Sequence, residues 1–362
     1  MRKTTLAVLL AVAGTFVGLE RTPRFLAWGQ EKVAQGSKSG PSTRTGESRL
    51  PSGDSRATEP NLKVAFIGDS GYGPSEQAVL NLIKSEGAQA VLHQGDFDYH
   101  GDPVGFWSSV DKVLGANFPY FISVGNHDIA NWPATVKPSY SQYLVGRMAR
   151  IGVKPDRTNL NSQMYSLVFK GLKVVFVGES RGVGDQVYAP YIKARLAADN
   201  HIWKVCSWHR NMAAMQMGDK TDDMGWGVYE ECKDNGAIIA TAHEHSYERT
   251  KTLTSIRNQI VDSLSPDPNR LTVAPGRTFV FVSGLGGESI RPQRRCLPAV
   301  APYGCNGEWA KIYTSNQNAQ YGALFITFNV DGDQNKARGY FKNISGTIVD
   351  EFEIINETGS SH

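Results

Sequence analysis

Apolar runs alternate with amphipathic segments along the part of the chain that follows residue 60. The runs at 63–68, 90–94 and 119–124 have the length of buried strands, and each is followed by polar residues. Segments 75–87 and 106–115, which lie between them, place apolar residues on one helical face. This β-α-β-α-β order predicts a parallel sheet, because parallel neighbours need a crossover connection.

The alternation resumes after a less regular stretch at 129–163. Strands are predicted at 173–178, 202–208 and 237–242, with helices at 188–199 and 225–236. Four apolar runs joined by short turns then favour antiparallel pairing, at 279–287, 322–330, 337–343 and 346–354. Since no internal repeat is present, one domain with two sheets fits better than two independent domains.

The N-terminal 60 residues have a different composition. Arg2 and Lys3 precede an apolar run at 6–17, which is shorter than the roughly 20 residues that span a bilayer. We interpret residues 1–18 as a secretory signal peptide, so the protein is expected to be secreted or periplasmic, without a stable membrane anchor. Ser, Gly, Pro and Thr dominate the following segment, so residues 19–60 are predicted to be a disordered linker before a domain at 61–357.

The charge of the chain argues against a nucleic-acid partner. The formal net charge is +3, but residues 1–60 hold nine basic and five acidic residues. The remaining chain therefore has 29 basic and 30 acidic residues. A nearly neutral domain lacks the basic surface of a nucleic-acid-binding protein.

Four cysteines follow the predicted signal peptide, and an even number in a secreted chain suggests disulfides. Cys296 and Cys305 enclose a short Pro-containing loop, and this is the favoured pair. For Cys206 and Cys232, a second disulfide and two buried free thiols both remain open.

Potential metal ligands occur where the predicted strands end. They are Asp69, Asp96, Tyr99, Asn126, His209, His243 and His245, with His127 directly after Asn126. Each residue alone suits a structural role, such as a helix cap or a turn. In open α/β sheets, however, the loops at the carboxyl ends of the strands form one site. Carboxylate, amide and imidazole donors suit iron, zinc or manganese, and their number predicts two ions that share a carboxylate.

Five ordered motifs resemble those of the calcineurin-like metallophosphoesterases. They are GDSG at 68–71, GDFDY at 95–99, GNHD at 125–128, VCSWH at 205–209 and AHEHSYER at 242–249. Tyr99, three residues after Asp96, and the SYER sequence after the His-x-His pair resemble more narrowly the purple acid phosphatases. The similarity extends from about residue 63 to residue 355.

The resemblance implies an α/β fold class, namely a four-layer α/β/β/α sandwich with two mixed sheets flanked by helices and a metal site at the strand C-terminal ends. It also implies that Asp69, Tyr99 and His245 hold Fe³⁺. Asn126, His209 and His243 would hold a second, divalent ion (Fe²⁺, Zn²⁺ or Mn²⁺). Asp96 would bridge the two ions.

The activity implied is that of a secreted binuclear-metal acid phosphatase, in which metal-bound hydroxide attacks a small phosphate monoester. His127 is the candidate catalytic residue, because it follows the ligand Asn126 and is free to stabilise or protonate the leaving oxygen. Its alternative role is to orient a ligand. A phosphodiesterase or nucleotide phosphatase on the same metal centre is the first alternative function. The second is a non-catalytic secreted binding protein.

Other residues near the motifs have less defined roles. Asp98, His100 and Asp102 are interpreted as turn residues or supports of the ligands, and Arg210 and Asn211 as either phosphate contacts or loop residues. Four methionines between 212 and 224 form either a lid over the pocket or core filling. The glycines of 283–289 are expected to let the backbone turn close to the site.

Overall fold

The computed structural model describes residues 56–157, 159–180 and 182–358. The predicted signal peptide and most of the predicted linker lie outside the described residues. Thr58 is buried and its carbonyl accepts a hydrogen bond from Asn329 Nδ2, while the Glu59 N–H donates to the carbonyl of Lys170. Packed residues therefore already occur before residue 61.

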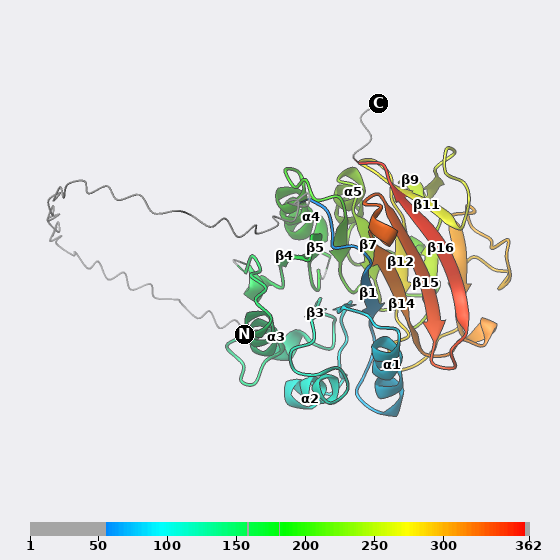
Figure 1. Ribbon diagram of the computed structural model, residues 1–362. Helices are drawn as coiled ribbons and strands as arrows, with labels where there is room; N and C mark the ends of the chain where they lie inside the picture. Colours follow the sequence, from blue (N-terminus) through cyan, green and yellow to red (C-terminus); the bar gives the residue numbers. More distant parts are fainter. Residues whose placement is uncertain (1–55, 158, 181, 359–362) are drawn as a thin grey trace, which may run out of the picture. The chain divides into compact units, whose positions relative to one another are not determined.

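The first sheet has seven strands in the order β11-β16-β15-β14-β1-β2-β3 (Figure 1). Their bounds are β1 Leu62–Ile67, β2 Ala90–His93, β3 Tyr120–Ile122, β11 Arg270–Val273, β14 Gly322–Phe328, β15 Lys336–Asn343 and β16 Ile348–Asn356. Strands β1, β2 and β3 are parallel to one another, whereas β14, β15 and β16 add to β1 in antiparallel pairs. The sheet is therefore mixed, with the predicted parallel unit at one end.

The second sheet also has seven strands, in the order β13-β8-β12-β7-β6-β5-β4. Their bounds are β4 Tyr165–Phe169, β5 Leu172–Phe176, β6 Lys204–Ser207, β7 Ile238–Thr241, β8 Tyr247–Thr250, β12 Val280–Ser283 and β13 Trp309–Tyr313. Strands β5, β6, β7 and β12 are parallel, and antiparallel strands flank them. A separate hairpin pairs β9 (Leu253–Ser255) with β10 (Ile260–Val261).

Helices cover the outer faces of the two sheets. Their bounds are α1 Pro74–Ser85, α2 Pro103–Leu114, α3 Tyr140–Arg150, α4 Gly184–Leu196 and α5 Trp226–Asp234. Helices α1 and α3 contact the first sheet, and α2 packs against these two helices. Helix α5 contacts the second sheet and packs against α4.

The main hydrophobic core lies between the two sheets. Phe66 of β1 meets Phe281 of β12 edge to face, with 5.2 Å between ring centroids, and the hydroxyl of Ser283 donates to the carbonyl of Phe66. A second core fills the space between β5, β6 and β7 and the helices α4 and α5. The fold is therefore the four-layer α/β/β/α sandwich with two mixed sheets that the resemblance implied.

Helix α3 lies in the stretch for which the sequence predicted no element. Its buried face combines Tyr140, Leu144 and Met148 with a charged residue, Arg147. The Arg147 guanidinium pairs with Asp111, donates to two backbone carbonyls, and lies 4.7 Å from the Trp107 ring centroid. A buried arginine interrupts the apolar period of this helix, so the pattern did not reveal it.

Two disulfides are present. Cys296–Cys305 confirms the favoured pair, and Cys206–Cys232 resolves the open alternative in favour of a second bridge. The second bridge joins β6 to α5 and is fully buried. Within the described residues, no helix has both the length and the apolar content needed to cross a membrane.

Candidate metal centre

The predicted ligands lie in loops that leave the carboxyl ends of parallel strands. Asp69 follows β1, Asp96 and Tyr99 follow β2, Asn126 follows β3, His209 follows β6, and His243 and His245 follow β7. The loops of the two sheets are joined directly, since the His243 N–H donates to Asp69 Oδ2 at 2.8 Å. One edge of the sandwich thus gathers side chains from both sheets.

Asp69, Tyr99 and His245 form one cluster. The Tyr99 hydroxyl lies 3.0 Å from Asp69 Oδ1 and 3.1 Å from His245 Nε2. His245 Nε2 lies 3.4 Å from the same oxygen of Asp69. The three side chains that the sequence assigned to the first metal therefore converge, and their role as ligands stays a prediction.

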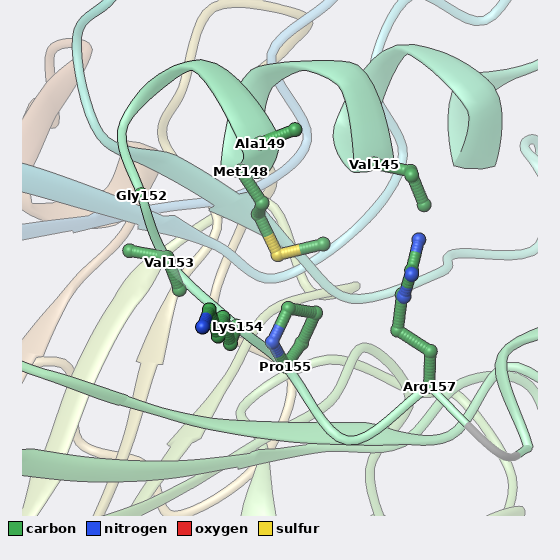
Figure 2. A pocket seen from close by; sticks show the side chains of 8 residues that line it. All are labelled: Val145, Met148, Ala149, Gly152, Val153, Lys154, Pro155 and Arg157. Carbon is green, nitrogen blue, oxygen red and sulfur yellow. The ribbon is translucent and has the colours of Figure 1, made fainter. Parts of the chain in front are cut away.

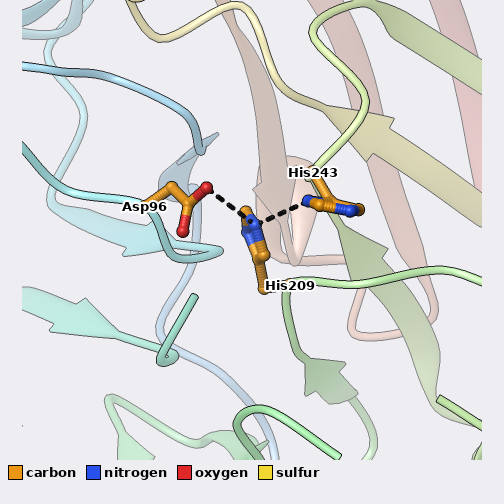
Figure 3. Close-up of side chains that lie close together, drawn as sticks. All are labelled: Asp96, His209 and His243. Carbon is orange, nitrogen blue, oxygen red and sulfur yellow. Dashed lines mark hydrogen bonds and ion pairs between the residues drawn. The ribbon is translucent and has the colours of Figure 1, made fainter. Parts of the chain in front are cut away.

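Asp96, His209 and His243 form the second cluster, shown in Figure 3. His209 Nε2 is 3.1 Å from Asp96 Oδ2 and 3.1 Å from His243 Nδ1. One potential ligand atom from each residue lies within 4.8 Å of the others. Because His209 Nε2 is also 3.9 Å from Asp69 Oδ1, the two clusters adjoin.

His127 approaches the second cluster from the loop after β3, whereas the side chain of its neighbour Asn126 contacts Arg210. The His127 N–H donates to Asp96 Oδ1 at 2.9 Å, and its ring nitrogen Nε2 lies 4.0 Å from Asp96 Oδ2. The His127 side chain is 46% exposed, and its ring centroid is 4.5 Å from that of Tyr99. His127 is therefore open to solvent above the two predicted metal positions. The Asn126 amide oxygen accepts from Arg210 Nε at 3.3 Å.

Neighbouring groups orient the predicted ligands, and two of them, Gln94 and Ser289, lie outside the five motifs. The carbonyl of Gln94 lies 2.8 Å from His209 Nδ1, and the hydroxyl of Ser289 contacts His245 Nδ1. These contacts leave the Nε2 atom of each ring facing the cluster, as is usual for metal-binding histidines. The carboxylate of Asp128 accepts the N–H groups of Gly125, Asp96 and Phe97, which fixes the loop that carries Asp96.

The backbone at the ligands is unusual. Asp69, Asp96, Tyr99 and His243 all have positive φ, between 53° and 69°. Non-glycine residues rarely adopt this left-handed conformation, and where they do it often marks a functional site.

The turn after β2 is built by Asp98. Its carboxylate accepts the N–H groups of His100, Gly101 and Asp102 and the hydroxyl of Tyr140. Asp102 caps α2 through the N–H of Gly105. Asp98 and Asp102 are thus turn and cap residues, and Asp98 supports the left-handed conformation of the neighbouring predicted ligand Tyr99.

Glycines of the loop after β12 allow the backbone to pass close to the ligands. The Gly286 N–H donates to the carbonyl of Gly68. A side chain at Gly284 would meet Asp69 Oδ2 at 2.7 Å and the Glu244 carbonyl at 2.1 Å. This segment therefore serves as a close wall of the site, as its glycine content suggested.

The electrostatics of the buried carboxylates favour a cation. Burial disfavours their charge, but the imidazoles of His245 and His209 hold the pKa of Asp69 well below its usual range, and His209 does the same for Asp96. Burial alone would lower the pKa of His209, yet Asp96 and Asp69 outweigh it and raise that pKa to about 9.

Burial raises the pKa of the Tyr99 hydroxyl, and the charges of Asp69 and Asp96 raise it further. Tyr99 is therefore a neutral phenol unless a cation offsets the carboxylates. A metal cation would supply that charge, and phenolate is a hard anionic donor. The donor set thus fits two cations, with the phenol as the most demanding ligand.

The loop after β6 carries cationic residues as well as His209. Arg210 is paired with Asp223 at 2.7 Å and Glu179 at 3.2 Å. The ammonium of Lys220 donates to the carbonyl of His243, a contact that no sequence motif signalled. The four methionines of this segment are buried, so they pack the loop against the interior of the protein and do not form an exposed lid.

A hollow lined mainly by apolar residues lies elsewhere on the described surface. Figure 2 shows this hollow of about 480 Å³, formed by α3 and the segment after it. Val145, Met148, Val153 and Pro155 line it, with Lys154 and Arg157 beside them. None of the predicted site residues contributes to its wall.

The fold and this group of side chains define the class of protein. The chain belongs to the calcineurin-like phosphoesterase family, whose model matches residues 62–247. The fold of this family implies a binuclear metal site. No curated protein matches the chain significantly.

Two solved structures share the fold. Purple acid phosphatase PPD1 from seeds of yellow lupin (Lupinus luteus) has 18% sequence identity and a TM-score of 0.61, over 83% of this chain and 55% of its own. This chain thus spans about half the length of the lupin protein. GAP50, the anchor in the inner membrane complex of Plasmodium, has 11% identity and a TM-score of 0.51, over 83% of this chain and 91% of its own.

Proposed function

We propose that this protein is a binuclear metal-dependent phosphatase of the purple acid phosphatase type that hydrolyses phosphate monoesters outside the cytoplasm. The observation that carries the proposal is that two clusters of potential metal ligands adjoin, and that one of them contains the phenol of Tyr99. Asp69, Tyr99 and His245 would hold Fe³⁺. Asp96 would be shared with a divalent ion (Fe²⁺, Zn²⁺ or Mn²⁺) held by Asn126, His209 and His243.

When bound, two cations supply an activated water as nucleophile and neutralise charge on the phosphoryl oxygens. The protein contributes the geometry, since Asp128, Gln94 and Ser289 fix the ligands before substrate arrives. His127 would donate a proton to the leaving oxygen, a role supported by its exposed ring beside Asp96 and its anchored backbone.

An extracytoplasmic location is supported by the two disulfides, which form and persist in oxidising compartments. It is further supported by the predicted signal peptide at 1–18.

A non-catalytic role is the alternative from another class. GAP50 shares the fold and is described as an anchor. Against this role, all seven predicted ligand positions of the present chain hold donor side chains, and buried carboxylates would be costly to keep without a cation.

Rates on p-nitrophenyl phosphate and bis(p-nitrophenyl) phosphate, measured from pH 4 to 8 with the metal-loaded chain, test the proposal. A higher kcat/KM for the monoester, with an acidic optimum, is expected. A preference for the diester would replace the proposal with a phosphodiesterase on the same centre. Inactivity towards both esters with metal bound would favour the non-catalytic role.

A further inference from the structure

Two cationic side chains meet at the segment between the histidines of the His-x-His pair. Lys220, from the loop after β6, donates to the carbonyl of His243. Arg291, from the loop after β12, approaches the same carbonyl with its Nη1 at 3.4 Å. Both cations therefore border the metal centre on its His243 side, whereas His127 borders it beside Tyr99 and Asp96.

The charge at this position is not balanced by the neighbouring carboxylate. Glu244 Oε2 lies 3.9 Å from Lys220 Nζ and 3.7 Å from Arg291 Nη1. These separations exceed hydrogen-bond length, and among the described residues this oxygen has no hydrogen-bond partner. Glu244 therefore pairs only loosely with the two cations, and Asp69 and Asp96, two predicted metal ligands, also act on Lys220.

Arg210 shows the contrasting arrangement in the same loop. It is paired with the carboxylates of both Asp223 and Glu179, at 2.7 Å and 3.2 Å. Its charge is therefore satisfied within the protein, and its guanidinium serves to hold Asn126. Lys220 and Arg291 instead share the carboxylate of Glu244, at the longer distances of 3.9 Å and 3.7 Å.

The two cations are also held in place and open to solvent. The Arg291 backbone is anchored on both sides, because its N–H donates to the carbonyl of His245 and its carbonyl accepts from Ser315. The carbonyl of Lys220 accepts from Gln216 Nε2 at 3.0 Å. The Arg291 side chain is 39% exposed and that of Lys220 is 19% exposed, so both can reach a ligand. Preorganised cations of this kind bind phosphate strongly, arginine through two parallel hydrogen bonds.

We propose that Lys220 and Arg291 form a subsite for a second phosphate group, carried by the alcohol part of the substrate. This inference rests on the proposed function and specifies its substrate class as phosphate monoesters that bear a further phosphate a few bonds from the reacting one. The reacting phosphate would be bound by cations held by the predicted ligands, with His127 beside it. The second phosphate would be bound by Lys220 and Arg291 beside His243.

The test compares butane-1,4-diol bisphosphate with butyl phosphate, two probes that differ only in the second phosphate. For the metal-loaded full chain, the ratio of their kcat/KM values is measured by release of inorganic phosphate. In Lys220→Met and in Arg291→Gln, this ratio is expected to fall roughly tenfold, the size of one charge-assisted hydrogen bond. Lys220→Arg retains the charge and should retain the ratio. The control Lys193→Gln removes an exposed cation of α4 that pairs with Glu231, and should leave the ratio unchanged.

An unchanged ratio in both variants would overturn the subsite. So would an equal loss for both probes, since that result would place the cations at the reacting phosphate or make them supports of His243. Calorimetric binding of the two probes to metal-loaded protein gives a second readout that does not depend on turnover. A chain that turns over neither probe but loses bisphosphate affinity in Lys220→Met would contradict the phosphatase proposal and retain the subsite.

Discussion

Four of the predicted ligands adopt a backbone conformation that side chains rarely take. The left-handed φ values of Asp69, Asp96, Tyr99 and His243 cost about 1 kcal/mol or more each. Hydrogen bonds to Asp128 and Asp98 stabilise the turns at Asp96 and Tyr99, respectively. The ligand loops are thus held by carboxylates that are not themselves predicted ligands.

His127→Ala should lower kcat for a phosphate monoester about 100-fold, because protonation by a general acid accelerates the departure of a poor leaving group by at least that factor. Both metal ions should stay bound, since the backbone N–H that contacts Asp96 is unchanged. Steady-state kinetics with metal analysis check this result, and His201→Ala, a histidine paired with Asp199, is the control. Full activity in His127→Ala would contradict the acid role.

Asp128→Asn should destabilise the protein by about 1–3 kcal/mol. The carboxylate accepts three backbone N–H groups, and an amide leaves at least one of them facing another donor. Denaturant unfolding measures the change, and Asp331→Asn at an exposed turn serves as the matched control. Equal stability of the two variants would show that Asp128 does not hold the Asp96 loop.

At the residue scale, the sequence predicted which side chains gather but not what supports them. Asp69, Asp96 and His209 directly follow the apolar strand runs, so the topology of parallel strands brings them together. Lys220 and Arg291 reach the His243 carbonyl across 23 and 48 residues of chain, through irregular loops. Such contacts depend on tertiary structure, which the periodicity of apolar residues in the sequence does not predict.

At the scale of elements, the loop between β6 and α5 connects the second sheet with the predicted metal site. It holds His209, Arg210 and Lys220, and the Cys206–Cys232 disulfide closes it at its base. The buried methionines pack it from within. The loop is therefore fixed at both ends and along its length.

Replacing Cys206 and Cys232 by Ala should reduce the free energy of unfolding by about 3 kcal/mol, since the bridge restricts a long loop in the unfolded chain. The Cys296/Cys305 double alanine variant is the comparison. The Cys296–Cys305 bridge has a sequence separation of 9, whereas that of Cys206–Cys232 is 26. Removing the shorter loop should therefore reduce the free energy of unfolding by about 1 kcal/mol less. Denaturant unfolding under matched conditions measures both, and a larger loss for the shorter loop would contradict this ranking.

Two of the elements that the sequence did not predict, β8 and α3, contain buried charged residues. β8, with the sequence YERT, is fully buried because Arg249 pairs with Asp350 through two nitrogens, at 2.7 and 2.9 Å. α3 contains the buried Arg147. In both, a specific ion pair replaces apolar burial, and the partner lies far away in sequence. The strands with continuous apolar runs, such as β1 and β12, were predicted correctly.

At the scale of the whole molecule, buried carboxylic acids should make stability depend on pH. Burial raises the pKa of Glu76 to about 7 and that of Glu248 to about 8, against 4.5 for an ordinary glutamate. At these two glutamates the folded chain therefore binds more protons than the unfolded chain between pH 4.5 and 7–8, so their contribution to stability falls as pH rises through this window. The lowered pKa values of Asp69 and Asp96 act only below their ordinary value of 3.8, where stability falls with falling pH.

The metal-free protein should consequently have a higher Tm at pH 5 than at pH 8. Glu76→Gln should remove the contribution of Glu76 to this pH dependence, which is up to about 1.4 kcal/mol of unfolding free energy per pH unit between pH 4.5 and 7. Thermal unfolding across pH measures both chains. A Tm that rises from pH 5 to pH 8 would contradict the protonated state of these buried acids.

The central claim is a binuclear centre with a ferric ion bound by Tyr99, and metal analysis combined with the visible absorption spectrum tests it most directly. We expect two metal ions per chain, at least one of them iron, and a visible charge-transfer band that is lost in Tyr99→Phe. A purified wild-type chain that stays colourless and metal-free after incubation with iron and zinc, or a band that persists in Tyr99→Phe, would contradict it.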